Sequence, residues 1–418
     1  MPLNRSNRTR AALASTSAAA MLALAACSGG GSQTPDDGPL TMYTWVSGES
    51  DQAQWDSFIA GAQEVDPDLE ITVEGPSFTD YWTKVKTRLS GDNPPCILTT
   101  QAARAQELEA LLMPLDDLIA EQDLDTDAID ASMLQGMTVD GSVRAIPYDA
   151  EPIVLYYNQD TFTEAGLDLP TTTYTREQFL DDARALTDGE DYALAITPGI
   201  FIPNAWALAD GVPAVTEDGE LALTDPEFVA QMQSYYDLVA VEQVARAPEA
   251  SDSGELAQQA FINGEVDMLI EGPWMYGTFA ESAEFEMGLT IVPSTSGEAT
   301  AMTAGSGFGI ASNCDRPEEA FEAIVALTSQ GVQETQAAER GIVPARIDAL
   351  PAWQEGKAEG AGDVIAALLG NATAQLTTPT WNQVETLTTQ YATQGYRGEM
   401  TAAEIMELIS NSAASAAG

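Results

Sequence analysis

The 418-residue sequence contains no histidine and few cations, and both absences restrict what the protein can do. Without imidazole, Ser-His-Asp and Cys-His nucleophile arrangements and imidazole metal sites are excluded. Lysine and arginine total 16 against 65 aspartates and glutamates, which gives a formal net charge of -49. A body this acidic repels nucleic acid, whose binding requires cations that neutralise phosphates, and anionic membrane surfaces. We interpret the acidity as a solubility adaptation.

The hydrophobic fraction of 44% supports a sizeable core, and the length allows two domains. At the start of the chain, Arg5, Arg8 and Arg10 precede the small, mostly apolar stretch 11–26. That stretch is too short to remain as a membrane span, and a positive segment before an apolar one is typical of a secretory signal. We predict a signal peptide over residues 1–26.

Cysteine is scarce, with three residues in the whole chain. Leu24–Cys27 (LAAC) resembles a bacterial lipobox, so we predict lipidation of Cys27, anchoring to the cell membrane outside the cytoplasm, and a flexible tether over residues 27–39. The alternative is an ordinary secretory signal with an incidental cysteine. Cys96 and Cys314 remain, and they either pair in an oxidising compartment or stay as buried thiols.

The hydrophobic pattern alternates between strand and helix. Trp55, Phe58, Ile59 and Ala62 follow the i, i+3, i+4, i+7 spacing of one helix face. The β-α-β-α-β order at the start predicts a mostly parallel sheet covered by helices, and the pattern restarts later. The expected strands are 40–46, 69–73, 96–100, 153–157, 266–270 and 305–311, and the expected helices are 80–89, 175–186, 226–241 and 255–263, with a helical C-terminal part.

Several short segments occur in one order along the chain: 24–27 (LAAC), 113–117 (MPLDD), 145–149 (AIPYD), 154–162 (VLYYNQDTF), 165–170 (AGLDLP), 261–268 (FINGEVDM), 272–274 (GPW) and 341–344 (GIVP). In this order they resemble the family 1 extracellular solute-binding proteins of ABC importers, in the maltose/oligosaccharide-binding group. The resemblance implies no chemistry on the ligand, no cofactor and no metal. It implies a carbohydrate ligand, ABC transporter permease subunits as partners, and a monomer.

The fold class that the resemblance implies is α/β, with two lobes of the periplasmic-binding-protein type (class II) joined by a hinge. Crossovers are expected near Tyr148–Pro152 and Met302–Gly305. The lobes would comprise residues 40–148 plus 304–345, and residues 149–303 plus 346–418, and the ligand would lie between them.

A sugar site needs flat aromatic rings for C–H faces and carboxylates or amides for hydroxyls. Trp274, after a strand and Gly-Pro, is the first stacking candidate, and the resemblance also points to Trp381. Trp45 ends the first strand, where α/β sheets place ligands, and Trp206 is a candidate for a lobe rim. For each tryptophan the alternative role is packing in a core.

The polar candidates come from the crossovers and the strand ends. Asp149 and Glu151 flank the first crossover, and the alternative for them is a hinge salt bridge or plain exposure. The others are Ser47, Thr100, Asn204, Glu271, Ser306, Gly307 and Arg340, of which Ser306 and Gly307 allow close backbone approach and Arg340 has the alternative role of a helix C-terminal cation.

Three other functions stay open for the same sequence. A secreted glycosidase would use two carboxylates about 5–10 Å apart, and no spacing here singles out such a pair. The same fold could bind a non-sugar solute such as glycerol phosphate or a peptide, although a phosphate would need more cations. A surface adhesion module would show no saturable binding of small molecules.

Overall fold

The computed structural model describes residues 38–416 except for 92, 190 and 250. The predicted signal peptide, Cys27 and the tether up to residue 37 lie outside the described residues. Among those described, no helix is both long and apolar enough to cross a membrane.

The first sheet has five strands in the order β2-β1-β3-β13-β6. β1 runs parallel to β2 and β3, whereas β13 runs antiparallel to both β3 and β6. The sheet is therefore mixed, because β13 enters it from a later part of the chain and in the opposite direction. The strands are β1 Leu40–Tyr43, β2 Ile71–Glu74, β3 Ile97–Gln101, β6 Ala145–Pro147 and β13 Ser306–Ile310.

The helix predicted from the spacing of Trp55, Phe58 and Ala62 is confirmed, and all three side chains are fully buried. Phe58 packs edge-on against Phe308 of β13, with ring centroids 5.7 Å apart. We call the hydrophobic cluster that contains these residues the N-terminal core. Its helices include α1 Glu49–Val65, α4 Asp116–Glu121, α5 Ala131–Gly136, α12 Pro317–Leu327 and α13 Gln330–Arg340. The helix α2 Phe78–Leu89 packs in a smaller separate cluster, against Tyr43 and Leu98 of the same sheet.

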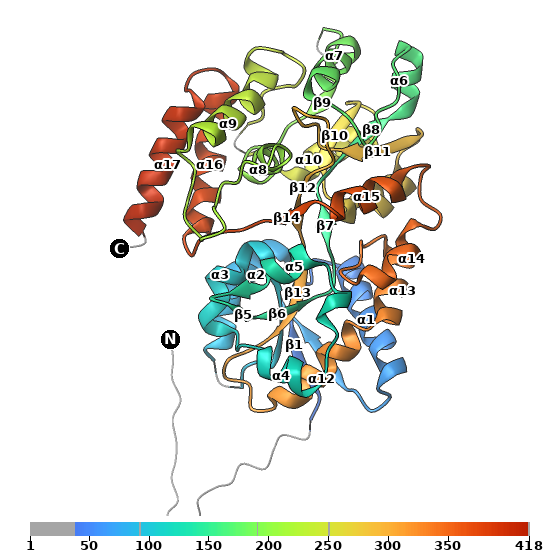
Figure 1. Cartoon of the computed structure of the whole chain (residues 1–418), viewed down its shortest axis with the longest axis vertical. Helices are drawn as coiled ribbons and strands as arrows, with labels where there is room; N and C mark the ends of the chain where they lie inside the picture. Colours follow the sequence, from blue (N-terminus) through green and yellow to red (C-terminus); the bar gives the residue numbers. More distant parts are fainter. Residues whose placement is uncertain (1–37, 92, 190, 250, 417–418) are drawn as a thin grey trace, which may run out of the picture. The chain divides into compact units, whose positions relative to one another are not determined.

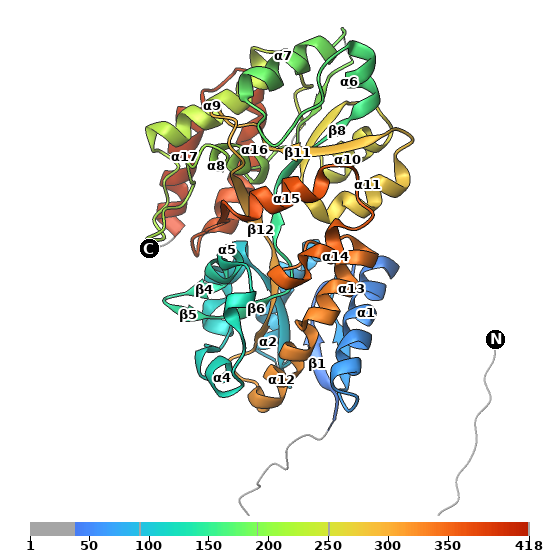
Figure 2. The ribbon, with the colours of Figure 1, turned by 45° about the vertical axis from the view of Figure 1, so that its right-hand side comes forward.

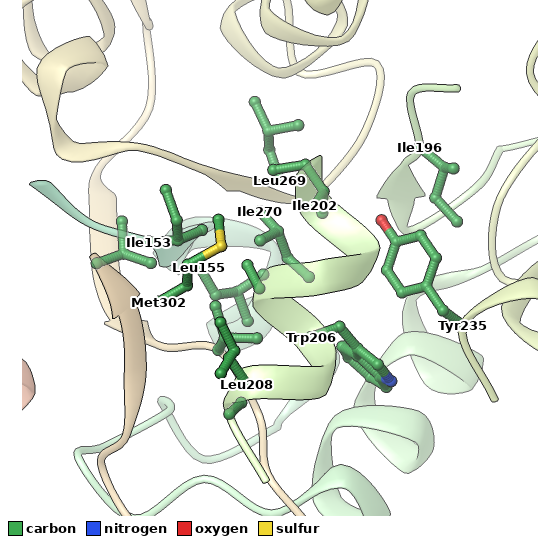
Figure 3. Packing of buried hydrophobic residues seen from close by; sticks show 14 of the residues in the cluster. Ile153, Leu155, Ile196, Ile202, Trp206, Leu208, Tyr235, Leu269, Ile270 and Met302 are labelled. Atoms are coloured by element: carbon green, nitrogen blue, oxygen red, sulfur yellow. The ribbon is translucent and has the colours of Figure 1, made fainter. Parts of the chain in front are cut away.

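The second sheet has four strands in the order β11-β8-β10-β9. β8 is buried along its whole length, as its apolar run from Val154 to Tyr157 favours, and it is antiparallel to both neighbours. We call the cluster around it the C-terminal core, part of which Figure 3 shows. The strands are β8 Val154–Asn158, β9 Leu194–Ala195, β10 Met268–Glu271 and β11 Met287–Ile291.

Several helices of the C-terminal core begin at the residues that the sequence favours for helix starts. Asn158 caps the first helix after β8, and Thr175 and Gln178 form a reciprocal capping box. The helices are α6 Gln159–Ala165, α7 Arg176–Leu186, α8 Phe201–Leu208, α9 Pro226–Ala240, α10 Gly254–Ile262, α11 Tyr276–Ser282, α14 Leu350–Gln354, α15 Ala361–Leu369, α16 Trp381–Tyr396 and α17 Ala402–Ala416.

A small sheet with the order β14-β12-β7 lies between the two larger groups of elements (Figures 1 and 2). Its strands are β7 Glu151–Pro152, β12 Ala301–Ala304 and β14 Ala372–Ala374. Met302 packs in the C-terminal core, and Phe308 packs in the N-terminal core. The chain therefore passes from one core to the other directly after this sheet.

Cys96 and Cys314 form a disulfide, with their Cα atoms 4.8 Å apart. The bond joins the residue before β3 to the segment after β13. Asp315 lies close to both sulfurs, but these three groups do not form a metal site because the disulfide consumes both thiols.

Candidate functional site

Two buried carboxylates, Asp149 and Glu151, accept hydrogen bonds from backbone N–H groups of two later segments of the chain. Asp149 is 8% exposed and accepts a hydrogen bond from the backbone N–H of Ser306, just after β12. Glu151 is 2% exposed, and its Oε1 accepts from the N–H of Val343 at 3.2 Å. Both residues were predicted from the sequence, and the structure places them in the same short segment at the small sheet.

The surroundings of these carboxylates oppose their ionisation. Burial raises the pKa of Asp149 to about 8, although the hydrogen bond from Ser306 lowers it. Burial and then the charge of Asp149 raise the pKa of Glu151 well above its ordinary value. Donors such as ligand hydroxyls would stabilise the charged form of these acids.

Unpaired polar atoms gather on the strands next to these carboxylates. Thr303 Oγ1, Thr100 Oγ1 and Gln375 Nε2 are buried and have no hydrogen-bond partner among the described residues. Glu151 differs from them, because the backbone N–H groups of Val343 and Trp274 bond this carboxylate and lower its pKa, although burial raises it more. Glu151 and Thr303 lie on the paired strands β7 and β12, Gln375 donates its backbone N–H to the Thr303 carbonyl at 3.0 Å, and Thr100 is opposite Gly307. Each such atom costs about 1–3 kcal/mol unless it is paired, so a polar group that reached these atoms would be stabilised by them.

Trp274 presents a flat ring at the edge of the C-terminal core. Its side chain is 37% exposed, and the indole rests directly on Gly272, where an added Cβ would lie 2.1 Å from ring carbons. The Phe201 ring is next to it, with centroids 6.2 Å apart. One face of the indole is thus supported by bare backbone, as a stacking platform requires.

A second aromatic group surrounds the end of β1. Trp45 is half-buried, and its ring centroid lies 5.3 Å from that of Phe78 and 6.0 Å from that of Trp82. Phe78 is 41% exposed, and Ser47 Oγ accepts its backbone N–H at 3.0 Å, so Ser47 positions the start of α2. The sequence analysis missed Phe78 and Trp82, although an aromatic pair at i and i+4 at a helix start was the available signal.

An ion pair between Arg104 and Glu385 links the aromatic group at the end of β1 to α16. The guanidinium of Arg104 lies 5.3 Å from the centre of the Trp82 ring, and its NH2 is 2.7 Å from Glu385 Oε2 on α16. Trp381 donates its indole N–H to the other oxygen of Glu385 at 3.2 Å. Trp381 itself is 1% exposed, so the prediction of a stacking face is corrected: its ring packs in the core, and its N–H orients Glu385.

Asn204 and Trp206 are both in the C-terminal core, at 1% exposure each. The Trp206 ring is covered by the Arg176 guanidinium at 4.1 Å, and its N–H binds Ser234 Oγ at 3.0 Å. Asn204 bonds Met302 Sδ and the N–H of Ala214. The expectation that these residues form a lobe rim is corrected, because α8 turns both side chains inward.

The remaining predicted residues have local roles. Glu271 accepts hydrogen bonds from the Gly272 N–H at 2.8 Å and from Gln258 Nε2 at 3.0 Å, and burial raises its pKa. Gly307 has no room for a Cβ, which would lie 2.8 Å from the Ile146 carbonyl of the adjacent strand. Arg340 ends α13 and donates to the Ser50 carbonyl at 3.3 Å, which favours its role as a helix C-terminal cation.

The family model for bacterial extracellular solute-binding proteins matches residues 46–334. The chain belongs to this family. The matched region includes the small-sheet strands β7 and β12, the two carboxylates and Trp274. Members of this family bind solutes outside the cytoplasm.

Two curated relatives show how far the similarity extends. The diacetylchitobiose binding protein DasA of Streptomyces coelicolor is 25% identical over 87% of this chain and 88% of its own length. The maltodextrin-binding protein MdxE of Bacillus subtilis is 24% identical over 61% of this chain and 67% of its own.

Solved structures share the fold across nearly the whole chain. The ABC substrate-binding protein Lmo0181 from Listeria monocytogenes, in complex with cycloalternan, has a TM-score of 0.80 at 19% identity and covers 91% of this chain and 99% of its own. Maltose-bound MalE3 of T. maritima has a TM-score of 0.75 at 19% identity, covering 90% and 99%. UgpB of Mycobacterium tuberculosis, in complex with glycerophosphocholine, has a TM-score of 0.73 at 18% identity, covering 90% of this chain and 97% of its own. The two-lobe α/β fold predicted from the sequence is confirmed.

Proposed function

We propose that this protein is the extracytoplasmic binding component of an ABC importer for a carbohydrate of two or more sugar units. The observation that carries the proposal is the Trp274 indole, which is supported on Gly272 while the backbone N–H of Trp274 bonds the buried Glu151. Aromatic faces and convergent carboxylates suit pyranose rings and their hydroxyls. DasA and MdxE, whose names state saccharide ligands, support the same solute class.

A phosphorylated solute is the second candidate, because UgpB has the same fold and binds glycerophosphocholine. The charges around the site disfavour it. Asp149, Glu151 and Glu271 are buried there, and Arg104, whose guanidinium lies over the Trp82 ring, is already paired with Glu107 and Glu385. A phosphate beside these acids would raise their pKa values further and would have no free cation to pair with.

The remaining parts of the function belong to the same proposal. Lipidation of Cys27 would anchor the protein to the cell membrane, a tether up to residue 39 would give it reach, and permease subunits would receive the loaded form. The protein would act as a monomer and would not alter its ligand covalently. Turnover of a nitrophenyl glycoside panel would instead support a glycosidase.

A thermal-shift screen against mono- and oligosaccharides tests the function. A ligand at 100 times its dissociation constant adds about 2.7 kcal/mol to the free energy of unfolding, so at least one saccharide should raise the melting temperature clearly. Trp274→Ala should abolish that rise. Leu169→Ala, which removes another exposed hydrophobic side chain (40% exposed), is the control and should keep it. A rise that survives Trp274→Ala undiminished would refute the platform.

A further inference from the structure

A pocket of about 130 Å³ opens in the C-terminal core next to the Trp274 platform. Phe201, whose ring neighbours that of Trp274, forms one side, and Glu271, three residues before Trp274, forms another. The volume is several times the ~30 Å³ that one water occupies in the liquid, so a group of several heavy atoms fits.

Most of the pocket wall is apolar. Pro198, Phe201, Ile202, Leu269 and Ile270 line it, from β10, α8 and the loop before α8. Figure 3 shows Ile202, Leu269 and Ile270 close together around the helix that carries Ile202. An apolar wall favours a methyl or methylene group over a hydroxyl.

One hydroxyl in this wall makes no hydrogen bond with the residues that the structure describes. Tyr235 on α9 lines the pocket and is 1% exposed, and its ring end points toward Ile202 and Ile196 (Figure 3). Burial alone raises the pKa of its hydroxyl, with no hydrogen bond from the described residues acting on it. A buried O–H in an apolar wall is stabilised by any acceptor that reaches it.

Glu271 provides the complementary acceptor on the other side. Its Oε1 and Oε2 each accept one hydrogen bond, from Gly272 and Gln258. A carboxylate offers about four acceptor sites, so it can also take a donor from a ligand.

We propose that this pocket binds an acetamido substituent of the sugar, so that the solute is an N-acetylated saccharide. The methyl group would pack on Ile202 and Leu269, the carbonyl oxygen would accept from Tyr235 Oη, and the amide N–H would donate to Glu271. A hydroxyl at the same sugar position would reach neither the apolar wall nor Tyr235. This inference rests on the proposed function and specifies its ligand.

Titration calorimetry with matched sugar pairs tests the assignment. The pairs are N-acetylglucosamine with glucose, N-acetylgalactosamine with galactose, and N,N′-diacetylchitobiose with cellobiose, which differ at the acetamido position. We expect the acetylated member of at least one pair to bind tenfold or more tightly. Tyr235→Phe should reduce that preference about five- to tenfold, as loss of one buried hydrogen bond does.

Tyr236→Phe is the matched control, because Tyr236 is the next residue on α9 and is not among the pocket residues. Its hydroxyl is buried and has no hydrogen-bond partner among the described residues. It should keep the preference. Ala195→Leu, which fills the pocket, should weaken the acetylated ligand selectively, with the melting temperature as a check on folding.

The outcomes separate the two proposals. Saccharides that bind without preference for the acetylated member, or a preference unchanged by Tyr235→Phe, would overturn the acetamido pocket alone. If no member of any pair binds but another saccharide does in the thermal screen, the acetamido pocket is likewise overturned. If no saccharide of any kind binds, the carbohydrate function falls as well.

Discussion

At the scale of the residue, the Trp274 indole owes its position to a neighbour without a side chain. The backbone of Gly272 has φ -84° and ψ 152°, which any residue adopts, so this glycine is not needed for its conformation. It is needed for space, because a Cβ would collide with the indole at 2.1 Å. Alanine at position 272 would therefore fit the backbone dihedral angles but would collide with the indole.

Gly272→Ala should displace the indole and weaken saccharide binding roughly tenfold, about the value of one aromatic stacking contact. The free energy of unfolding should change by less than about 1 kcal/mol, because the partly exposed ring can move toward solvent. Calorimetry and denaturant unfolding measure the two effects. Gly331→Ala, where nothing lies within 4 Å, is the control. Unchanged affinity in Gly272→Ala would show that the ring position does not matter for binding.

At the scale of the element, the small sheet places two buried carboxylates where the chain passes from one core to the other. β7 carries Glu151, and Asp149 precedes it, with backbone amides of Ser306 and Val343 as their donors. These amides partly offset burial but do not cancel it, so both pKa values remain raised. The binding of a ligand or a change of pH can therefore change the protonation of Asp149 and Glu151.

The ligand-free protein should lose stability as pH rises from about 4 to about 8. Asp149 has a folded pKa of about 8 against an ordinary value of 3.8, so the folded state binds more protons throughout that window. Its contribution is complete below 3.8 and is lost as pH passes about 8, with a slope of at most about 1.4 kcal/mol per pH unit per proton. Glu151 acts in the same direction.

Asp149→Asn should flatten this dependence, because the amide oxygen still accepts from Ser306 but no longer titrates. Urea unfolding at several pH values measures the slope. Asp80→Asn, at an exposed carboxylate on α2, is the control. A wild-type stability that instead rises steadily between pH 4 and 8, with the same slope in Asp149→Asn, would contradict the account.

At the scale of the whole molecule, the Cys96–Cys314 disulfide joins residues 218 positions apart. The bond restricts the unfolded chain, and a loop of this length corresponds to roughly 5 kcal/mol in the chain-entropy model. Cys96 precedes β3, whereas Thr100 and Gln101 lie toward its other end, so the bond and the candidate site are at opposite ends of one strand.

Replacing both cysteines with alanine should lower the free energy of unfolding by about 2–5 kcal/mol and leave the saccharide affinity unchanged. Guanidinium unfolding and calorimetry measure these quantities. A reducing agent should destabilise the wild type but not the double variant. A double variant as stable as the oxidised wild type would show that the disulfide does not contribute.

The sequence predicted the positions of individual helices and strands better than it predicted how they pack together. The face of α1, the strand at 153–157 and the helices 175–186 and 226–241 follow from periodicity and capping signals in neighbouring residues, and the structure has them within one or two positions. The strand expected at 40–46 ends at Tyr43, and β14 was not expected, because a short strand depends on partners far away in sequence.

By itself the sequence determined the exclusion of histidine chemistry, the acidity, the alternation of strands and helices, and the acids at 149 and 151. Only the tertiary structure decided that Trp206 and Trp381 are buried while Trp274 is exposed, and that Cys96 and Cys314 are bonded. The physical reason is that hydrophobic periodicity shows which face of a single helix or strand is apolar, and not which other element covers that face. Exposure, pairing and an empty volume beside Tyr235 depend on which other elements pack against that face.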